Sequence, residues 1–101
     1  MDYEAITHHT GTVLVEFYAS WCPHCQRMMP VVEQVKQLLG EQVPVYQFDI
    51  DKEPKASDEA GVQSVPTFIV YRNGREMWRQ SGEMEAATLV STAEKYLSGD
   101  N

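Results

Sequence analysis

Cysteine and long apolar runs are scarce in this chain. Its 101 residues include two cysteines, too few for the disulfide frameworks that hold small secreted proteins together. No stretch approaches the roughly 20 apolar residues that a membrane-spanning helix needs. The start, MDYEAITHHTG, lacks a basic segment followed by an apolar one, so the sequence as written predicts no signal peptide. We therefore expect a cytoplasmic protein without a membrane partner. The alternative is a periplasmic or otherwise exported protein whose signal peptide has been removed.

Positive charge is also scarce. Eight lysines and arginines stand against fifteen aspartates and glutamates, which gives a net charge of −7. Surfaces that bind nucleic acid or anionic lipid are basic, so we expect neither partner. A chain of this length with 43% apolar residues is sufficient for one core. We expect a single domain spanning residues 1–101, and a monomer.

The apolar patterns that are present predict an α/β fold. Residues 12–18, TVLVEFY, are typical of a strand buried on both faces, and residues 43–50, VPVYQFDI, of a second strand. The helical pattern between them ends at Gly40 and predicts a right-handed βαβ unit. Residues 66–80 predict a hairpin with a type I′ turn at Asn73-Gly74. Short helices are predicted at residues 1–9 and 53–62, and a longer helix over residues 83–97.

Two of these helices are amphipathic. The long helix after the cysteines is predicted to turn one apolar stripe toward the core: Met28, Val31, Val32, Val35, Leu38 and Leu39. The last helix is predicted to do the same with Ala86, Leu89, Val90, Ala93 and Leu97. Pro30 lies inside the long helix, where it removes a backbone hydrogen bond and is expected to kink the axis.

Both cysteines lie in the motif CPHC, where the first strand ends and the long helix begins. Unpaired backbone N–H groups and the helix dipole favour a thiolate at Cys22, and Pro23 suits the first helical turn. Cys25, one turn deeper, is expected to be more buried and to have a higher pKa. This arrangement predicts a redox pair in which Cys22 attacks and Cys25 resolves. A structural staple is disfavoured, because so small a loop removes little entropy from the unfolded chain.

A metal site requires more ligands than the cysteine pair supplies. The other candidates are His8, His9 and His24, and their spacing does not resemble a zinc site. We therefore expect neither a metal nor another cofactor. A carrier that binds metal through the two thiols is kept as a less favoured alternative.

The segments FYASWCPHC and SVPTFIVYRNG, together with Pro30 and Gly82, resemble the thioredoxin superfamily over nearly the whole chain. The resemblance implies a thioredoxin-like fold and a thiol–disulfide oxidoreductase. Its substrates would be protein thiols and disulfides, and a reductase or oxidase would recycle it. The usual first strand is missing here, so we expect a mixed four-stranded sheet flanked by helices. Residues 43–49 would then form an exposed edge, where a second copy can pair.

The resemblance also implies roles for residues outside the cysteine pair. Glu16 matches the family's buried acid, which exchanges a proton with Cys25; an acid at a solvated strand end is the alternative. The lysine that often pairs with this acid is replaced by Gln47. Pro66 matches a cis-proline beside the disulfide, which would expose the Val65 backbone to an extended substrate. A trans proline that opens a strand is the alternative. Trp21 is expected to form part of the docking surface.

The dipeptide between the cysteines bears on the direction of the reaction. Pro23 and His24 resemble the pair found in strongly oxidising bacterial oxidases, and His24 can offer a hydrogen bond or partial positive charge to the Cys22 thiolate. We therefore predict a pair that is more oxidising than that of an ordinary thioredoxin. The stretch between Ile50 and Pro66 has no room for the helical insertion of those oxidases. A non-catalytic docking module remains the alternative from another functional class.

Overall fold

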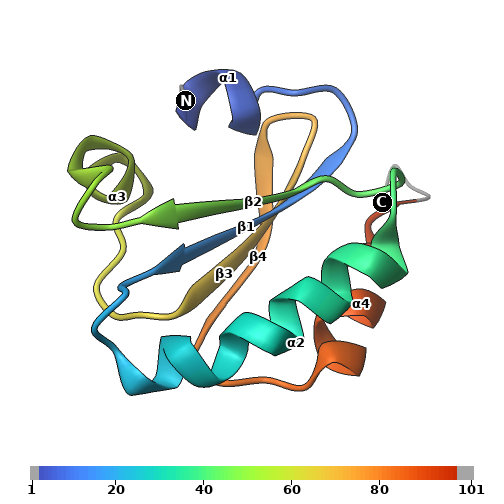
Figure 1. Ribbon diagram of the computed structural model, residues 1–101. Coiled ribbons are helices and arrows are strands. Elements are labelled where there is room, and N and C mark those ends of the chain that lie inside the picture. Colours follow the sequence, from blue (N-terminus) through green and yellow to red (C-terminus); the bar gives the residue numbers. More distant parts are fainter. Residues whose placement is uncertain (1–2, 98–101) are drawn as a thin grey trace.

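The computed structural model describes residues 3–97, which build one mixed sheet with helices on both faces (Figure 1). The strand order is β2-β1-β3-β4. Strand β1 (Thr12–Tyr18) runs parallel to β2 (Val45–Asp49) and antiparallel to β3 (Thr67–Arg72). Strand β4 (Arg75–Ser81) pairs antiparallel with β3. This arrangement confirms the predicted α/β fold with a four-stranded mixed sheet. Within the described residues no strand precedes the first helix.

The helices divide between the two faces of the sheet. Helices α1 (Tyr3–Thr7) and α3 (Pro54–Ala60) pack on one face, and α2 (Pro23–Leu39) and α4 (Ala86–Lys95) on the other (Figure 1). Side chains alternate along a strand, so β1 feeds both cores. Val13, Val15 and Phe17 pack beneath α1 and α3, whereas Leu14 packs beneath α2 and α4. By the same alternation, Glu16 lies on the α2 face, which is the face that carries the cysteines.

Aromatic rings fill the core under α1. The ring centroids of Tyr3 and Phe17 are 5.5 Å apart, and those of Phe17 and Phe48 are 5.4 Å apart. The hydroxyl groups of Tyr3 and Tyr71 share a buried hydrogen bond. The short N-terminal helix is therefore fixed to the sheet by large apolar side chains and one polar contact.

The turns form where the sequence predicts them. Asn73 and Gly74 both have positive φ, 51° and 84°, as a type I′ turn requires. Helix α3 is followed by Gly61 with φ 66°, and α2 by Gly40 with φ 60°. Helix α2 runs without interruption through Pro30 as far as Leu39. Among the described residues, no helix combines the length and apolar character that crossing a membrane requires.

Several boundaries differ from the prediction. Strand β2 begins at Val45, not at residue 43, because Pro44 has no N–H to contribute to the ladder. The carbonyl oxygen of Pro44 still accepts a 3.0 Å bond from the N–H of Leu14. Helix α4 spans ten residues and is shorter than predicted at both ends. The predicted first helix includes residues 1 and 2, which lie outside the described part of the chain.

One predicted core residue of α2 is exposed. Leu38 is 58% exposed, whereas its neighbour Leu39 is 2% exposed and packs in the core. The apolar stripe of α2 is narrower than the sequence pattern predicts. Consecutive side chains of a helix point about 100° apart, so Leu38 and Leu39 cannot both face the core. The prediction that Leu38 faces the core is therefore wrong.

Candidate active site

The two cysteines lie at the N-terminal end of α2. Cys22 is the N-cap residue, with extended backbone angles, and Pro23 is the first helical residue, as predicted. Cys25 is one turn deeper and 2% exposed, against 6% for Cys22. Both are free thiols. The Cys25 sulfur accepts a hydrogen bond from the Ala19 N–H at 3.5 Å. The order of burial therefore agrees with an attacking Cys22 and a resolving Cys25.

The surroundings of the two thiols shift their pKa values in opposite directions. The backbone N–H of Cys25 lowers the pKa of Cys22, against a raising effect of burial. The Cys25 thiol, the backbone N–H of His24 and the positive charge of Arg27 lower the pKa of Cys22 further. Burial raises the pKa of Cys25 to about 11. Near neutral pH the structure therefore favours a nucleophilic Cys22 beside a protonated Cys25.

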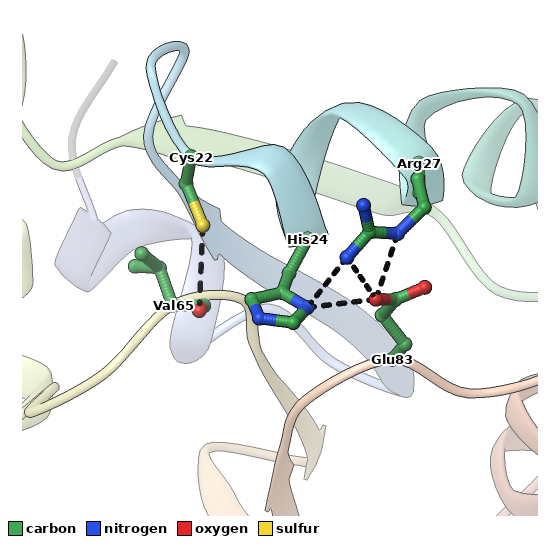
Figure 2. A network of polar contacts seen from close by, with 5 residues as sticks. All are labelled: Cys22, His24, Arg27, Val65 and Glu83. Atoms are coloured by element: carbon green, nitrogen blue, oxygen red, sulfur yellow. Dashed lines mark hydrogen bonds and ion pairs between the residues drawn. The ribbon is translucent and has the colours of Figure 1, made fainter.

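The ring of His24 does not make the contact with Cys22 that the sequence suggests. Its Nδ1 lies 2.7 Å from Oε2 of Glu83 and 3.0 Å from Nη2 of Arg27 (Figure 2). The hydrogen bond from His24 that stabilises the Cys22 thiolate comes from the backbone N–H. The ring is drawn away from the sulfur because the Glu83 carboxylate is a stronger hydrogen-bond partner than a thiol.

The segment before β3 lies against Cys22. The Val65-Pro66 bond is cis, as the resemblance implies. The Cys22 sulfur is 3.8 Å from the carbonyl oxygen of Val65, to which its S–H can donate (Figure 2). The Thr67 hydroxyl donates to the carbonyl oxygen of Ser64 at 2.6 Å. These bonds fix the backbone of residues 64–67 beside the reactive sulfur.

Trp21 forms one side of a hollow next to Cys22. The Trp21 side chain is 63% exposed, and its Nε1–H donates to Oδ2 of Asp51 at 2.9 Å. The hollow has a volume of about 350 Å³. Its lining comes from the loop between β1 and α2, the residue after β2, helix α3 and the segment before β3: Trp21, Cys22, Ile50, Ser57, Val62, Gln63, Ser64 and Val65. An exposed indole held in place beside a nucleophile suits a docking surface.

Glu16 is buried on the Cys25 side of the sheet. Its residue is 2% exposed, which excludes the alternative of an acid at a solvated strand end. Burial raises the pKa of Glu16, and a 2.9 Å hydrogen bond from the Gln47 amide opposes that rise. Glu16 and Cys25 line one small hollow of about 170 Å³, and the charge of Glu16 contributes to the raised pKa of Cys25. The carboxylate is therefore placed to exchange a proton with Cys25.

Three residues of the site have no role in the sequence-based prediction. Gln47 lies opposite Glu16 in the parallel register of β1 and β2, at the position where the resemblance placed it in place of a lysine, although no role was predicted for it. Arg27 and Glu83 meet beside His24, with Arg27 Nη2 2.8 Å from Glu83 Oε2. No local pattern predicts this contact, because 56 residues separate the two side chains in the sequence.

The remaining polar side chains offer no evident metal site. Among residues 3–97, no group of three or more histidine, cysteine, aspartate or glutamate side chains is placed to hold a metal ion. The chemistry available to this site is that of the thiol pair and of the acid, imidazole and guanidinium around it.

Comparison with known proteins agrees with this geometry. The family model described as Thioredoxin matches residues 2–95. A thioredoxin-like protein of Synechocystis sp. is 38% identical over 85 residues, which cover 84% of this chain and 81% of that protein. A thioredoxin of the same organism is 35% identical over 85 residues, covering 84% and 79%. The structure of a mutant thioredoxin from Halobacterium salinarum superposes with a TM-score of 0.84 at 28% identity, covering 97% of this chain and 85% of that one.

Proposed function

The chain belongs to the thioredoxin family and is a thioredoxin-type disulfide oxidoreductase, and from that premise we propose that it exchanges disulfides with protein substrates through Cys22 and Cys25. The observation that carries the proposal is the opposite shift of the two thiol pKa values within one helical turn. A thiolate attacks and a thiol does not, so this difference supports Cys22 as the group that attacks first and Cys25 as the group that attacks second.

In the reducing direction, the Cys22 thiolate attacks one sulfur of a substrate disulfide. The substrate S–S bond breaks, its other sulfur leaves as a thiolate, and a mixed disulfide joins Cys22 to the substrate. Cys25 then gives its proton to the Glu16 carboxylate and attacks the Cys22 sulfur. The mixed disulfide breaks, the second substrate sulfur leaves as a thiolate, and two electrons have passed to the substrate. The reverse sequence oxidises a substrate dithiol.

Substrate binding is proposed at the surface between Trp21 and Val65. An extended substrate segment would pair with the Val65 backbone, as an added strand pairs with a sheet edge. The adjacent hollow of about 350 Å³ offers apolar contacts from Trp21 and Ile50 to a neighbouring substrate side chain. Protein thiols and disulfides are therefore the proposed partners, with a separate reductase or oxidase recycling the pair. The protein is proposed to act as a monomer.

We further propose that the pair is more oxidising than that of an ordinary thioredoxin. Each pKa unit by which the Cys22 thiolate is stabilised below neutral pH stabilises the reduced form by about 1.4 kcal/mol, or about 30 mV. The lowered pKa of Cys22 and the nearby charge of Arg27 support this direction. Redox titration of the pair against glutathione measures it. A potential at or below the value of about −270 mV typical of thioredoxin would contradict the proposal.

The function itself is tested by insulin reduction. The intact chain is expected to turn over many times with dithiothreitol as the recycling reductant, and Cys22→Ser to fall to the uncatalysed rate. A Cys25→Ser variant, which keeps the nucleophile, is expected to accumulate a mixed disulfide with the substrate. Equal slow rates for the intact chain and Cys22→Ser would indicate the docking module. Stoichiometric metal in the purified protein would indicate the carrier.

A further inference from the structure

Glu83 connects two side chains of the active-site helix to a loop on the other side of the site. Its Oε2 lies 2.7 Å from His24 Nδ1, 2.8 Å from Arg27 Nη2 and 3.0 Å from Arg27 Nε (Figure 2). One carboxylate oxygen therefore lies within hydrogen-bond distance of both the imidazole and the guanidinium. Two of the three contacts join the ionised guanidinium to the ionised carboxylate, and such bonds are stronger than neutral ones.

The loop that carries Glu83 is itself fixed to the active site. The N–H of Gly82 donates to the carbonyl oxygen of Pro66 at 2.8 Å, and Gly82 has a φ of 101°, which favours glycine. One residue earlier, the Ser81 hydroxyl lies 2.7 Å from the Thr67 hydroxyl. The position of the Glu83 backbone is thus set by the same segment that contacts the Cys22 sulfur. The carboxylate is a fixed anchor for side chains on α2.

The two anchored side chains are exposed and otherwise free to rotate. The side chains of His24 and Arg27 are 61% and 56% exposed. Arginine loses up to about 2 kcal/mol of rotamer entropy when it is held in one conformation, so an anchor is needed to keep its charge in place. The positive charge of Arg27 favours the Cys22 thiolate. Glu83 is ionised near neutral pH, because Arg27 and then His24 lower its pKa to about 2.

The contact with Glu83 also sets the orientation of the imidazole. Nδ1 is the ring nitrogen that faces both the Glu83 carboxylate, at 2.7 Å, and the Arg27 guanidinium, at 3.0 Å. In Figure 2 the other ring nitrogen is on the side of the ring that is turned toward Cys22 and Val65.

We propose that Glu83 is a positioning residue of the redox site: by holding the Arg27 guanidinium and the His24 imidazole at the head of α2, it favours the Cys22 thiolate. Glu83 does not touch the sulfur in this arrangement and acts through these two side chains. The inference rests on the proposed redox function, and it adds a residue from the loop before α4 to the site.

The direction in which the Cys22 pKa shifts distinguishes this role from a direct effect of the Glu83 charge on the sulfur. If the carboxylate acted on Cys22 only through its own negative charge, removing that charge would lower the Cys22 pKa. If it acts by holding the Arg27 guanidinium at the head of α2, neutralising it releases that positive charge and raises the Cys22 pKa. The two accounts predict opposite shifts for the same substitution.

The test measures the Cys22 pKa from the pH dependence of iodoacetamide alkylation in Glu83→Gln. We expect the pKa to rise by roughly half a unit, the size typical of partly exposed ion pairs. The alkylation rate below the pKa would then fall about threefold. The equilibrium constant with glutathione is expected to shift by a similar factor, toward a more stable disulfide. An unchanged or lowered Cys22 pKa would overturn the proposal.

Two controls complete the experiment. Glu85→Gln removes the same charge two residues further along the chain, where no side-chain cap bond is made, and is expected to leave the Cys22 pKa unchanged. In the background His24→Gln/Arg27→Met, adding Glu83→Gln is expected not to raise the Cys22 pKa, because the side chains that Glu83 holds are gone. A rise in that background would also refute the proposed role.

The result is separable from the test of the function. Alkylation reports on the thiolate whether or not the protein turns over insulin. If the intact chain turns over insulin and the Cys22 pKa does not rise in Glu83→Gln, the proposed oxidoreductase function is retained and the proposed role of Glu83 is refuted. Absence of turnover in the intact chain would instead remove the proposed function.

Discussion

At the scale of single residues, the chemistry depends on environments that differ over one helical turn. Cys22 faces backbone N–H groups and a guanidinium, whereas Cys25 is enclosed by apolar atoms and the Glu16 carboxylate. A cysteine side chain is therefore favoured as a thiolate at position 22 and as a protonated thiol at position 25. Glu16 is the group that we propose as the base that accepts the Cys25 proton before the second attack.

Replacing Glu16 with Gln is expected to slow the resolving step and to leave the first attack unchanged. Gln retains the size of the side chain and an oxygen for the Gln47 amide, but it cannot accept the Cys25 proton. General-base catalysis is typically worth about 10²-fold or more, so resolution of a mixed disulfide at pH 7 should slow by at least that order. Stopped-flow measurement of mixed-disulfide decay checks this, with Cys22 alkylation as the control.

The pH dependence of the same step gives a second criterion. Because burial alone raises the pKa of Cys25 above its ordinary value, decay in Glu16→Gln is expected to accelerate about tenfold per pH unit across the neutral and mildly alkaline range. The intact chain should show a weaker dependence once Glu16 is ionised. Parallel pH profiles for the two proteins would show that Glu16 is not the base.

At the scale of the elements, α2 packs one stripe of side chains into the core and carries the redox motif at its first turn. Its buried side chains are Cys25, Met28, Val32, Val35 and Leu39. These follow one another at intervals of three or four residues, so the cysteine that resolves is itself the first member of the core stripe. Packing of the helix against the sheet thus fixes the depth of Cys25.

The two adjacent leucines at the end of α2 test this assignment. Leu39→Ala removes a side chain that is 2% exposed and is expected to lower the free energy of unfolding by about 2 to 5 kcal/mol. Leu38→Ala, at 58% exposure, is expected to change it by about 0.5 kcal/mol or less. Urea unfolding of the two variants measures the difference. Similar losses in both would mean that the stripe is wider than the structure indicates.

At the scale of the whole molecule, the site lies where three distant segments meet at one end of the sheet. The head of α2, the segment before β3 and the loop before α4 are joined by the Cys22–Val65, Gly82–Pro66 and Glu83–Arg27 contacts. Burying the Glu16 carboxyl group between β1 and α2 opposes the stability of the fold, because burial disfavours the charged form.

Glu16 therefore makes stability depend on pH. Its folded-state pKa is raised, so the folded protein binds the proton more tightly than the unfolded chain. Stability is then lost as the pH rises from the ordinary carboxyl pKa through the folded value. Glu16→Gln lacks this loss, so its free energy of unfolding should exceed that of the intact chain by more at pH 8 than at pH 4. Urea titrations at both pH values check this. An equal difference in the free energy of unfolding at pH 4 and pH 8 would show that burial does not destabilise the charged form of Glu16.

The sequence by itself determined the features that depend on neighbouring residues. Alternating and helical apolar patterns, glycine at helix ends and Asn73-Gly74 locate the elements, and the CPHC spacing locates the thiols, because each signal lies within a few residues of its effect. Whether Glu16 is buried, which way the His24 ring turns and which groups hold it were decided by the tertiary structure alone. Those contacts join residues 31 to 59 positions apart, and such neighbours arise from packing of the sheet and its loops.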